Sequence, residues 1–230
     1  GQTLLLDAAV TGGGGLTKAG AGTLTLGASA DGYTGPTTSG GGTLSVAEVP
    51  AGALVFGRGT LAFTGTSGAS SQPVTIASGT NAAVLLAGGD LTLSGPVSTT
   101  SGAFFKSGAG AVSFTGATTN HIGAANAANM NAIAAAGVDG DGPSAGFGAF
   151  NVAQGRVTLG AEGQSNVIAG ALLVGLSTTA AARAETAGEL VVAGGSTVCG
   201  DWTYVGRNNG SATTAPAGLA SRLLVESGSF

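Results

Sequence analysis

Carboxylates are the side chains of this sequence best suited to acid–base or metal chemistry, and nearly all of them stand alone. Cleavage of a polysaccharide needs several acidic groups close together, either as an acid and a base or as Ca²⁺ ligands. Isolated acids between Gly, Ala and Thr instead favour solubility and turn formation. The isolated acids are Asp7, Asp31, Glu48, Asp90, Glu162, Glu185, Glu189, Asp201 and Glu226.

Two further acids, Asp139 and Asp141, lie in an Asp-Gly-Asp-Gly segment. Their oxygens could bind Ca²⁺, but the Asp-x-Asn/Asp spacing that continues to a distal Glu is missing, and so is the Gly-Gly-x-Gly-x-Asp repeat. The single imidazole, His121, has no Ser, Cys or Asp that can be assigned to it as a triad partner, and we interpret it as a turn residue. We therefore predict no catalytic residue, no metal site and no cofactor.

Two other features could serve chemistry or binding, and each has a structural interpretation. Cys199 is the only cysteine. We interpret it as a small buried side chain in a strand over residues 196–199, with a reactive thiol as the alternative. The glycine runs 12–15 and 40–42 precede neither a helical pattern nor a Gly-Lys-Ser/Thr motif, which predicts chain corners rather than phosphate binding.

Trp202, Tyr204 and Arg207 form the one aromatic cluster that includes a cation. Exposed aromatic rings often stack on sugars or on partner proteins. The pattern favours core packing or the covering of an end, and a glycan or protein contact is the alternative.

Composition narrows the class of protein. Only 8% of the 230 residues are charged, against roughly 25% in an average soluble domain, which excludes a charge-expanded disordered chain. No stretch approaches the ~18 uninterrupted apolar residues of a membrane-spanning helix, so we expect none. The seven Lys and Arg residues are scattered singly and the net charge is −4. Nucleic acid is therefore not an expected partner.

The elements that carry these residues are short strands with apolar side chains two apart and a Thr or Ser between many of them. This period of two indicates one buried and one exposed face. Gly-rich segments separate the strands. The predicted strand cores begin at Leu24, Leu44, Leu61, Val74, Leu91, Val112, Val157, Leu172, Leu190 and Leu223.

Two spacings occur between these strands. The steps from 24 to 44, 44 to 61, 74 to 91 and 91 to 112 are 20, 17, 17 and 21 residues, whereas the step from 54 to 61 is 7. A step near 20 suits one coil of a three-sided β-solenoid, and a step of 7 suits one side with its corner. Each strand buries too little apolar area to fold alone, so the coils must stack. We predict an all-β fold, a β-solenoid over residues 1–230.

One region departs from the strand pattern. Residues 124–136 hold eight alanines, a composition suited to a short helix, and a turn cluster follows. We predict an excursion from the solenoid over residues 120–147, with a return at Phe150. Two further excursions are predicted over residues 177–186 and 208–220.

The residues from Gly15 to Val46 also follow a known pattern: Gly15-Leu16-Thr17-Lys18, then Gly20-Ala21-Gly22-Thr23-Leu24-Thr25-Leu26, then Tyr33-Thr34-Gly35, Thr37-Thr38 and Gly42-Thr43-Leu44-Ser45-Val46. This stretch closely resembles the autotransporter-associated β-strand repeat. A degraded second copy runs from Phe105 to Gly116. The strong match covers about a seventh of the chain.

The resemblance implies a right-handed parallel β-helix in the passenger of a large bacterial surface protein, exported across the outer membrane, in which the repeat is scaffold. We expect a non-enzymatic structural segment: a rigid stalk, an adhesin body or a filament subunit. One alternative is a carbohydrate-active β-helix enzyme with a site on the excursions. Another is a glycan- or protein-binding module that uses the Trp202 region.

The expected location is extracellular or at the bacterial cell surface. Both limits of the chain, at Thr3–Leu6 and at Leu223–Phe230, have an apolar strand pattern without a polar cap. A solenoid with such ends exposes unpaired backbone. The expected partners are therefore further coils of a longer parent chain, or other copies of this chain stacked end to end.

Overall fold

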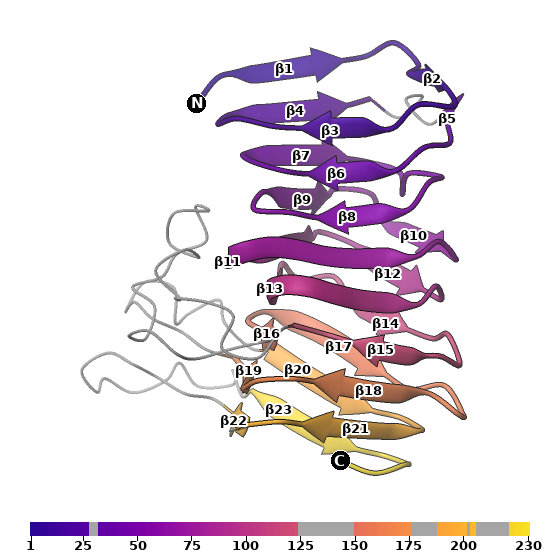
Figure 1. The fold of residues 1–230 in the computed structure, drawn as a ribbon, viewed down its shortest axis with the longest axis vertical. Coiled ribbons are helices and arrows are strands. Elements are labelled where there is room, and N and C mark those ends of the chain that lie inside the picture. The colour runs from indigo at the N-terminus through magenta and orange to yellow at the C-terminus, as the bar shows by residue number, and fades with distance from the viewer. Residues whose placement is uncertain (28–31, 124–149, 176–187, 202, 206–220) are drawn as a thin grey trace, which may run out of the picture.

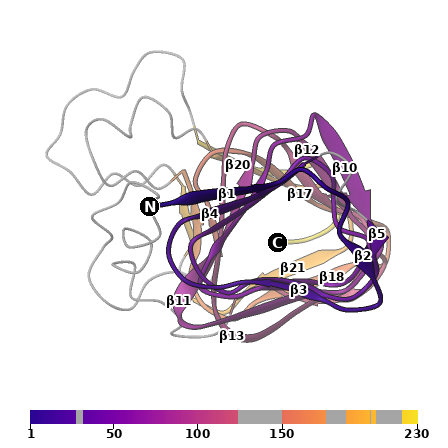
Figure 2. The same cartoon turned by 90° about the horizontal axis from the view of Figure 1, so that it is seen from above.

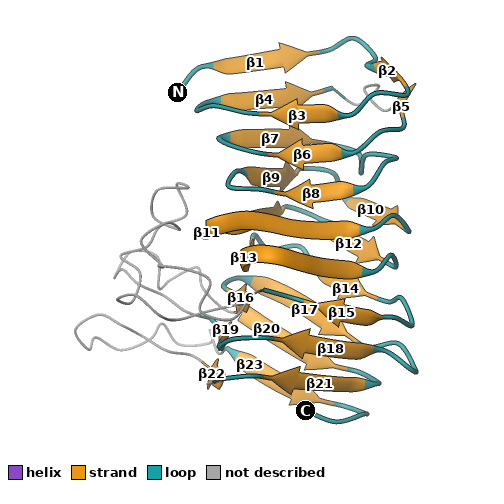
Figure 3. Cartoon of the chain, viewed as in Figure 1, coloured by secondary structure: helices purple, strands orange, loops and turns teal. Residues whose placement is uncertain are grey.

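The computed structural model describes residues 1–27, 32–123, 150–175, 188–201, 203–205 and 221–230. The described residues form strands joined by loops and turns, without a helix (Figure 3). Every strand pair is parallel. Successive coils stack along one axis, with the first coil and the last at opposite ends (Figure 1). Seen from the first coil, the chain runs clockwise as it recedes, so the solenoid is right-handed (Figure 2).

Each coil has three sides. Side 1 consists of β3 (Leu16–Lys18), β6 (Thr37–Ser39), β8 (Leu54–Phe56), the first parts of β11 (Val74–Ala87) and β13 (Val97–Ser107), β15 (Thr119–His121), β18 (Ser165–Ile168) and β21 (Ser196–Cys199). Side 2 consists of β1 (Thr3–Leu6), β4 (Thr23–Leu26), β7 (Thr43–Val46), β9 (Thr60–Phe63), the second parts of β11 and β13, β16 (Phe150–Val152), β19 (Leu172–Val174) and β22 (Thr203–Val205). Side 3 consists of β2 (Thr11–Gly12), β5 (Gly32–Tyr33), β10 (Ser67–Ser70), β12 (Asp90–Leu93), β14 (Val112–Phe114), β17 (Gly155–Leu159), β20 (Gly188–Val192) and β23 (Arg222–Val225).

The pairing register places like residues in columns. Leu24 of β4 lies beside Leu44 of β7, and Leu44 lies beside Leu61 of β9. The column continues to Leu85. Because successive side chains of a strand point to opposite faces, the apolar residues of each strand share the inner face. The ten strands predicted from the period of two are all present.

The core is one continuous cluster inside the coils. Of the eight residues predicted to point inward, seven are buried in this cluster: Leu26, Leu44, Val46, Leu91, Leu93, Val112 and Phe114. The eighth, Leu24, is half-buried and packs against the same cluster. Thr25 and Ser45, predicted to point outward, are half-exposed, and Thr92 is exposed. The predicted register is therefore confirmed.

Glycine occupies the corners because the coils stack too closely there for a side chain. A Cβ on Gly89 would overlap the carbonyl oxygen of Gly65, one coil earlier, and a Cβ on Gly110 would overlap that of Gly89. Gly42 has a φ of +60° and lies in the corner between β6 and β7. These corners use glycine both for close backbone approach and for positive φ.

Coil length varies along the solenoid. The register steps are 20 residues from Thr3 to Thr23 and 17 from Thr43 to Thr60. They are 45 from Val112 to Val157. Each long coil contains a segment outside the described residues, yet the strands on either side stay in register.

The excursion predicted over residues 120–147 starts later than expected. β15 runs to His121 and pairs with β18, Ile122 is buried in the core, and the chain re-enters the sheet at Phe150 as predicted. The alanine-rich segment 124–136 and the excursions predicted over 177–186 and 208–220 lie outside the described residues.

No helix among the described residues is long and apolar enough to cross a membrane.

Candidate functional site

The described acidic residues do not gather at one place. Over the part of the chain that the structure describes, no three His, Cys, Asp or Glu side chains lie close enough together to hold a metal ion. Asp90 accepts a hydrogen bond from the backbone N–H of Ala111 (2.9 Å), and Glu189 forms an ion pair with Arg156 on the neighbouring strand. Asp139 and Asp141 lie outside the described residues.

His121 is a strand residue rather than a turn residue. It ends β15, where pairing with Val167 of β18 holds its backbone extended, and its side chain is exposed. Its carbonyl oxygen accepts a hydrogen bond from the Thr99 hydroxyl at 2.8 Å. The turn interpretation was wrong because the parallel ladder between coils extends over these residues.

Cys199 ends β21, the strand predicted over residues 196–199. Its side chain is half-buried and packs against the core, and its Sγ lies 3.2 Å from the Gly170 carbonyl oxygen. The interpretation as a small packed side chain agrees with this environment.

The aromatic cluster at the last coil is only partly placed. Thr203–Val205 form β22 and pair with β19. Trp202 and Arg207 lie outside the described residues, and the side chain of Tyr204 is likewise not described. A stacking surface at Trp202 therefore stays a prediction.

The polar group that organises the first coils is Lys18, the last residue of β3. Its side chain points inward and is buried, and its Nζ donates to the carbonyl oxygens of Ala19 (2.9 Å), Gly20 (2.7 Å) and Gly41 (3.0 Å). The first two acceptors lie in the corner that follows Lys18, whereas Gly41 lies one coil later.

Lys106 repeats this arrangement in β13. Its side chain is fully buried, and its Nζ donates to the carbonyl oxygens of Gly108 (2.7 Å), Gly110 and Gln154 (2.6 Å). Burial lowers the pKa of the Lys106 ammonium from its ordinary 10.5 to about 8, and the carboxylate of Asp90 partly opposes that change. The three carbonyl oxygens satisfy the ammonium donors.

The two sites share a sequence signal, Lys-x-Gly-x-Gly, and a requirement on the following coil. Gly42 and Gly155 have φ values of +60° and +69°, and a Cβ on either would press against the lysine Nζ. Lys18 belongs to the corner between sides 1 and 2, whereas Lys106 belongs to the corner between sides 2 and 3. Sequence reasoning noted both repeats but missed the lysines' role, although the motif occurs twice.

A second buried polar group lies on side 1 of the later coils. The Asn120 side-chain amide donates to Asn166 Oδ1 at 3.0 Å, and Asn166 in turn donates to Gln164 Oε1 at 3.1 Å and to Thr197 Oγ1 at 3.3 Å. Gln164 donates to the Phe114 carbonyl oxygen at 2.9 Å. Because these amides are satisfied by one another and by backbone, they join successive coils and leave no chemistry to a ligand.

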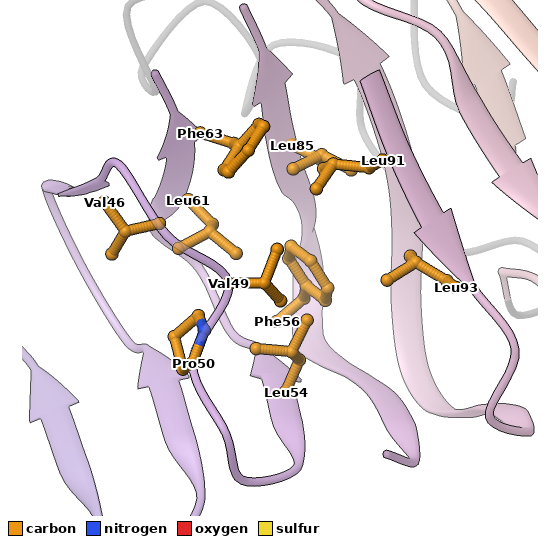
Figure 4. Close-up of a pocket in the computed structure, with 10 residues that line it drawn as sticks. All are labelled: Val46, Val49, Pro50, Leu54, Phe56, Leu61, Phe63, Leu85, Leu91 and Leu93. Carbon is orange, nitrogen blue, oxygen red and sulfur yellow. The ribbon is translucent and has the colours of Figure 1, made fainter. Parts of the chain in front are cut away.

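One small gap lies inside the solenoid between β7 and β12 (Figure 4). Its volume is about 10 Å³, and apolar side chains line it: Val46, Val49, Pro50, Leu54, Phe56, Leu61, Phe63, Leu85, Leu91 and Leu93. A space of this size without polar partners holds neither a substrate nor an ordered water. It is a packing gap of the core.

Comparison with known proteins finds no protein family, no curated protein and no solved structure that matches this chain.

Proposed function

We propose that this chain is a non-catalytic scaffold segment of a larger secreted or surface-displayed bacterial protein, in which it acts as a rigid stalk or spacer. The support is its three-sided stack of parallel coils, whose interior is filled by side chains and whose lysine and asparagine side chains hydrogen-bond within and between coils. The resemblance of residues 15–46 to the autotransporter repeat supports the extracellular location.

The observation that carries the proposal is the contrast between the ends and the middle of one apolar column. Leu44 is 0% exposed because coils cover it on both sides, whereas Leu4, in the same column at β1, is 59% exposed. At the other end Val198, Val205, Val225 and Phe230 are exposed. Uncovered core and unpaired strand edges favour the addition of further coils. We assign these as the partners of the two ends.

Sedimentation velocity of the 230-residue chain over a range of concentrations tests this assignment. Without covering coils, the ends of separate molecules should stack, so we expect concentration-dependent association. Leu4→Lys places a charge on the uncovered core and should shift the chain towards monomer.

Leu86→Lys is the matched control, because Leu86 is also exposed on side 2 (41%) but lies in the middle of the solenoid. It should leave the association unchanged. A monomer at high concentration and moderate salt would contradict the proposal, as would an equal effect of the two variants.

A further inference from the structure

The chain contains two lysines, Lys18 and Lys106, and both are buried. Solvated surfaces are the usual place for lysine, and a buried ammonium is costly unless its donors are satisfied. Each lysine has three carbonyl acceptors, and in each case one of them belongs to the following coil. A role in surface charge or solubility does not explain such a placement.

We propose that each Lys-x-Gly-x-Gly corner is a clamp that joins its coil to the next one, and that the Lys106 clamp seats the solenoid where it resumes after its longest interruption. The inference concerns how the coils are held together, and it stands whether or not the chain is a scaffold segment.

The joint at Lys106 is reciprocal. The Lys106 ammonium donates to the carbonyl oxygen of Gln154, and the Gln154 side-chain oxygen accepts from the backbone N–H of Gly108 at 3.1 Å. The backbone N–H of Ala153 donates to the carbonyl oxygen of Lys106 at 2.9 Å. Gln154 follows Lys106 by 48 residues, so this contact fixes the returning chain.

Lys18 serves as an internal comparison. Its acceptor in the next coil, Gly41, follows it by only 23 residues, and every strand between them is part of a regular coil. The ladders β3–β6 and β4–β7 already hold that joint. Loss of the Lys18 clamp should therefore loosen its own corner without affecting the later coils.

The charged groups around Lys106 do not replace its carbonyl acceptors. Asp90 on β12 influences the ammonium without a hydrogen bond to it, and Arg156 on β17 is paired with Glu189 on β20. Among the described residues, the hydrogen bonds of the Lys106 ammonium go to backbone oxygens. Removing the lysine leaves those oxygens without their partner.

Hydrogen–deuterium exchange of Lys106→Met tests the clamp. Met keeps the length of the side chain without its donors, and the stacked rings of Phe104 and Phe150 (centroids 5.8 Å apart) still hold β16 against β13. We expect the amides of residues 107–111 and 153–156 to exchange at least tenfold faster, with residues 19–22 and 40–43 unchanged.

Two further variants complete this experiment. Lys18→Met should give the reverse pattern, and Arg156→Met, which removes an exposed cation beside the same joint, should change exchange at 107–111 by less than twofold. A change below twofold at 153–156 in Lys106→Met would overturn the inference.

Amine acylation of the wild-type chain keeps the inference testable if Lys106→Met does not fold. Because the chain has two lysines, mass spectrometry can follow each one separately. Lys106 should react at least 100-fold more slowly in the folded chain than in the denatured chain at the same pH. Reaction at the rate of the denatured chain would show that the ammonium leaves its carbonyl acceptors freely, and the clamp would be refuted.

Discussion

At Ser39 the core column of side 1 carries a hydroxyl that the fold does not satisfy. Ser39 lies between Lys18 and Phe56 in the pairing register, and its Oγ is buried without a hydrogen-bond partner among the described residues. A buried polar atom without a partner keeps its desolvation cost. The nearby ammonium of Lys18 donates instead to backbone carbonyls.

Ser39→Ala should therefore raise the free energy of unfolding by about 1 kcal/mol. Urea denaturation followed by circular dichroism measures this change. Ser45→Ala, at a half-exposed outward position, is the control and should stay within about 0.5 kcal/mol of wild type. A destabilised Ser39→Ala would mean that the hydroxyl makes an unrecognised hydrogen bond.

Lys106 gives stability a dependence on pH whose sign follows from its pKa. The pKa is about 8 in the folded chain, because burial disfavours the ammonium, and 10.5 is its ordinary value. Between these values the unfolded chain binds more protons than the folded chain, so the free energy of unfolding rises with pH. Below pH 8 both states hold the proton, and this gain is absent.

The rise between pH 8 and pH 10.5 should reach at most about 3 kcal/mol. Other groups titrate over the same range, so the measurement compares wild type with Lys106→Met in urea at each pH. The difference between the two should increase with pH in favour of wild type. A difference that stays flat would show that the pKa of Lys106 is not lowered.

Among the elements, β7 shows most plainly how one strand serves two environments. Leu44 is buried in the core, and Ser45, its neighbour, is half-exposed on the outer face. Leu44→Ala leaves a cavity and should lower the free energy of unfolding by about 3 kcal/mol, whereas Ser45→Ala should cost almost nothing. Equal losses in thermal or urea unfolding would contradict the register of this strand.

The corners impose a different constraint from the strands. A Cβ on Gly89 would overlap backbone oxygens of Gly65 and Thr66, whereas one on Gly13 would meet nothing within 4 Å. Gly89→Ala should therefore lower the free energy of unfolding by about 2 kcal/mol or more, because backbone cannot move aside as a side chain can.

Gly13→Ala serves as the matched control. It should be neutral or slightly stabilising, since alanine restricts the unfolded chain. Thermal melts of the two variants beside wild type measure the contrast. A Gly89→Ala chain as stable as Gly13→Ala would show that the stacked corners can separate.

For the whole molecule, the scaffold proposal predicts that divalent cations and polysaccharides leave the chain unchanged. Melting temperatures with 1 mM EDTA and with added Ca²⁺ should agree, because the fold is held by apolar packing and by hydrogen bonds between coils. Incubation with a panel of acidic and neutral polysaccharides should release no reducing ends. A loss of several degrees in EDTA would point to a cation site at Asp139 and Asp141.

The sequence by itself determined the strands, their inward residues, the coil of about 20 residues and the glycine corners. Leu24-Thr25-Leu26 and its later equivalents repeat a period that any half-buried strand must have, and Gly40–Gly42 mark a corner by their backbone freedom. These features depend on residues close together in the chain, or on one regular repeat. They can therefore be recognised before any partner is known.

Only the tertiary structure decided which distant groups meet. The ammonium of Lys106 finds Gln154 across 48 residues, Asn120 finds Asn166 across 46, and His121 becomes a strand residue because β18 lies beside it. Sequence patterns do not specify these pairs, because the length of each interruption, and hence the register of the returning coil, is not set by local periodicity. The stacked coils set that register through the partners that each buried polar group requires.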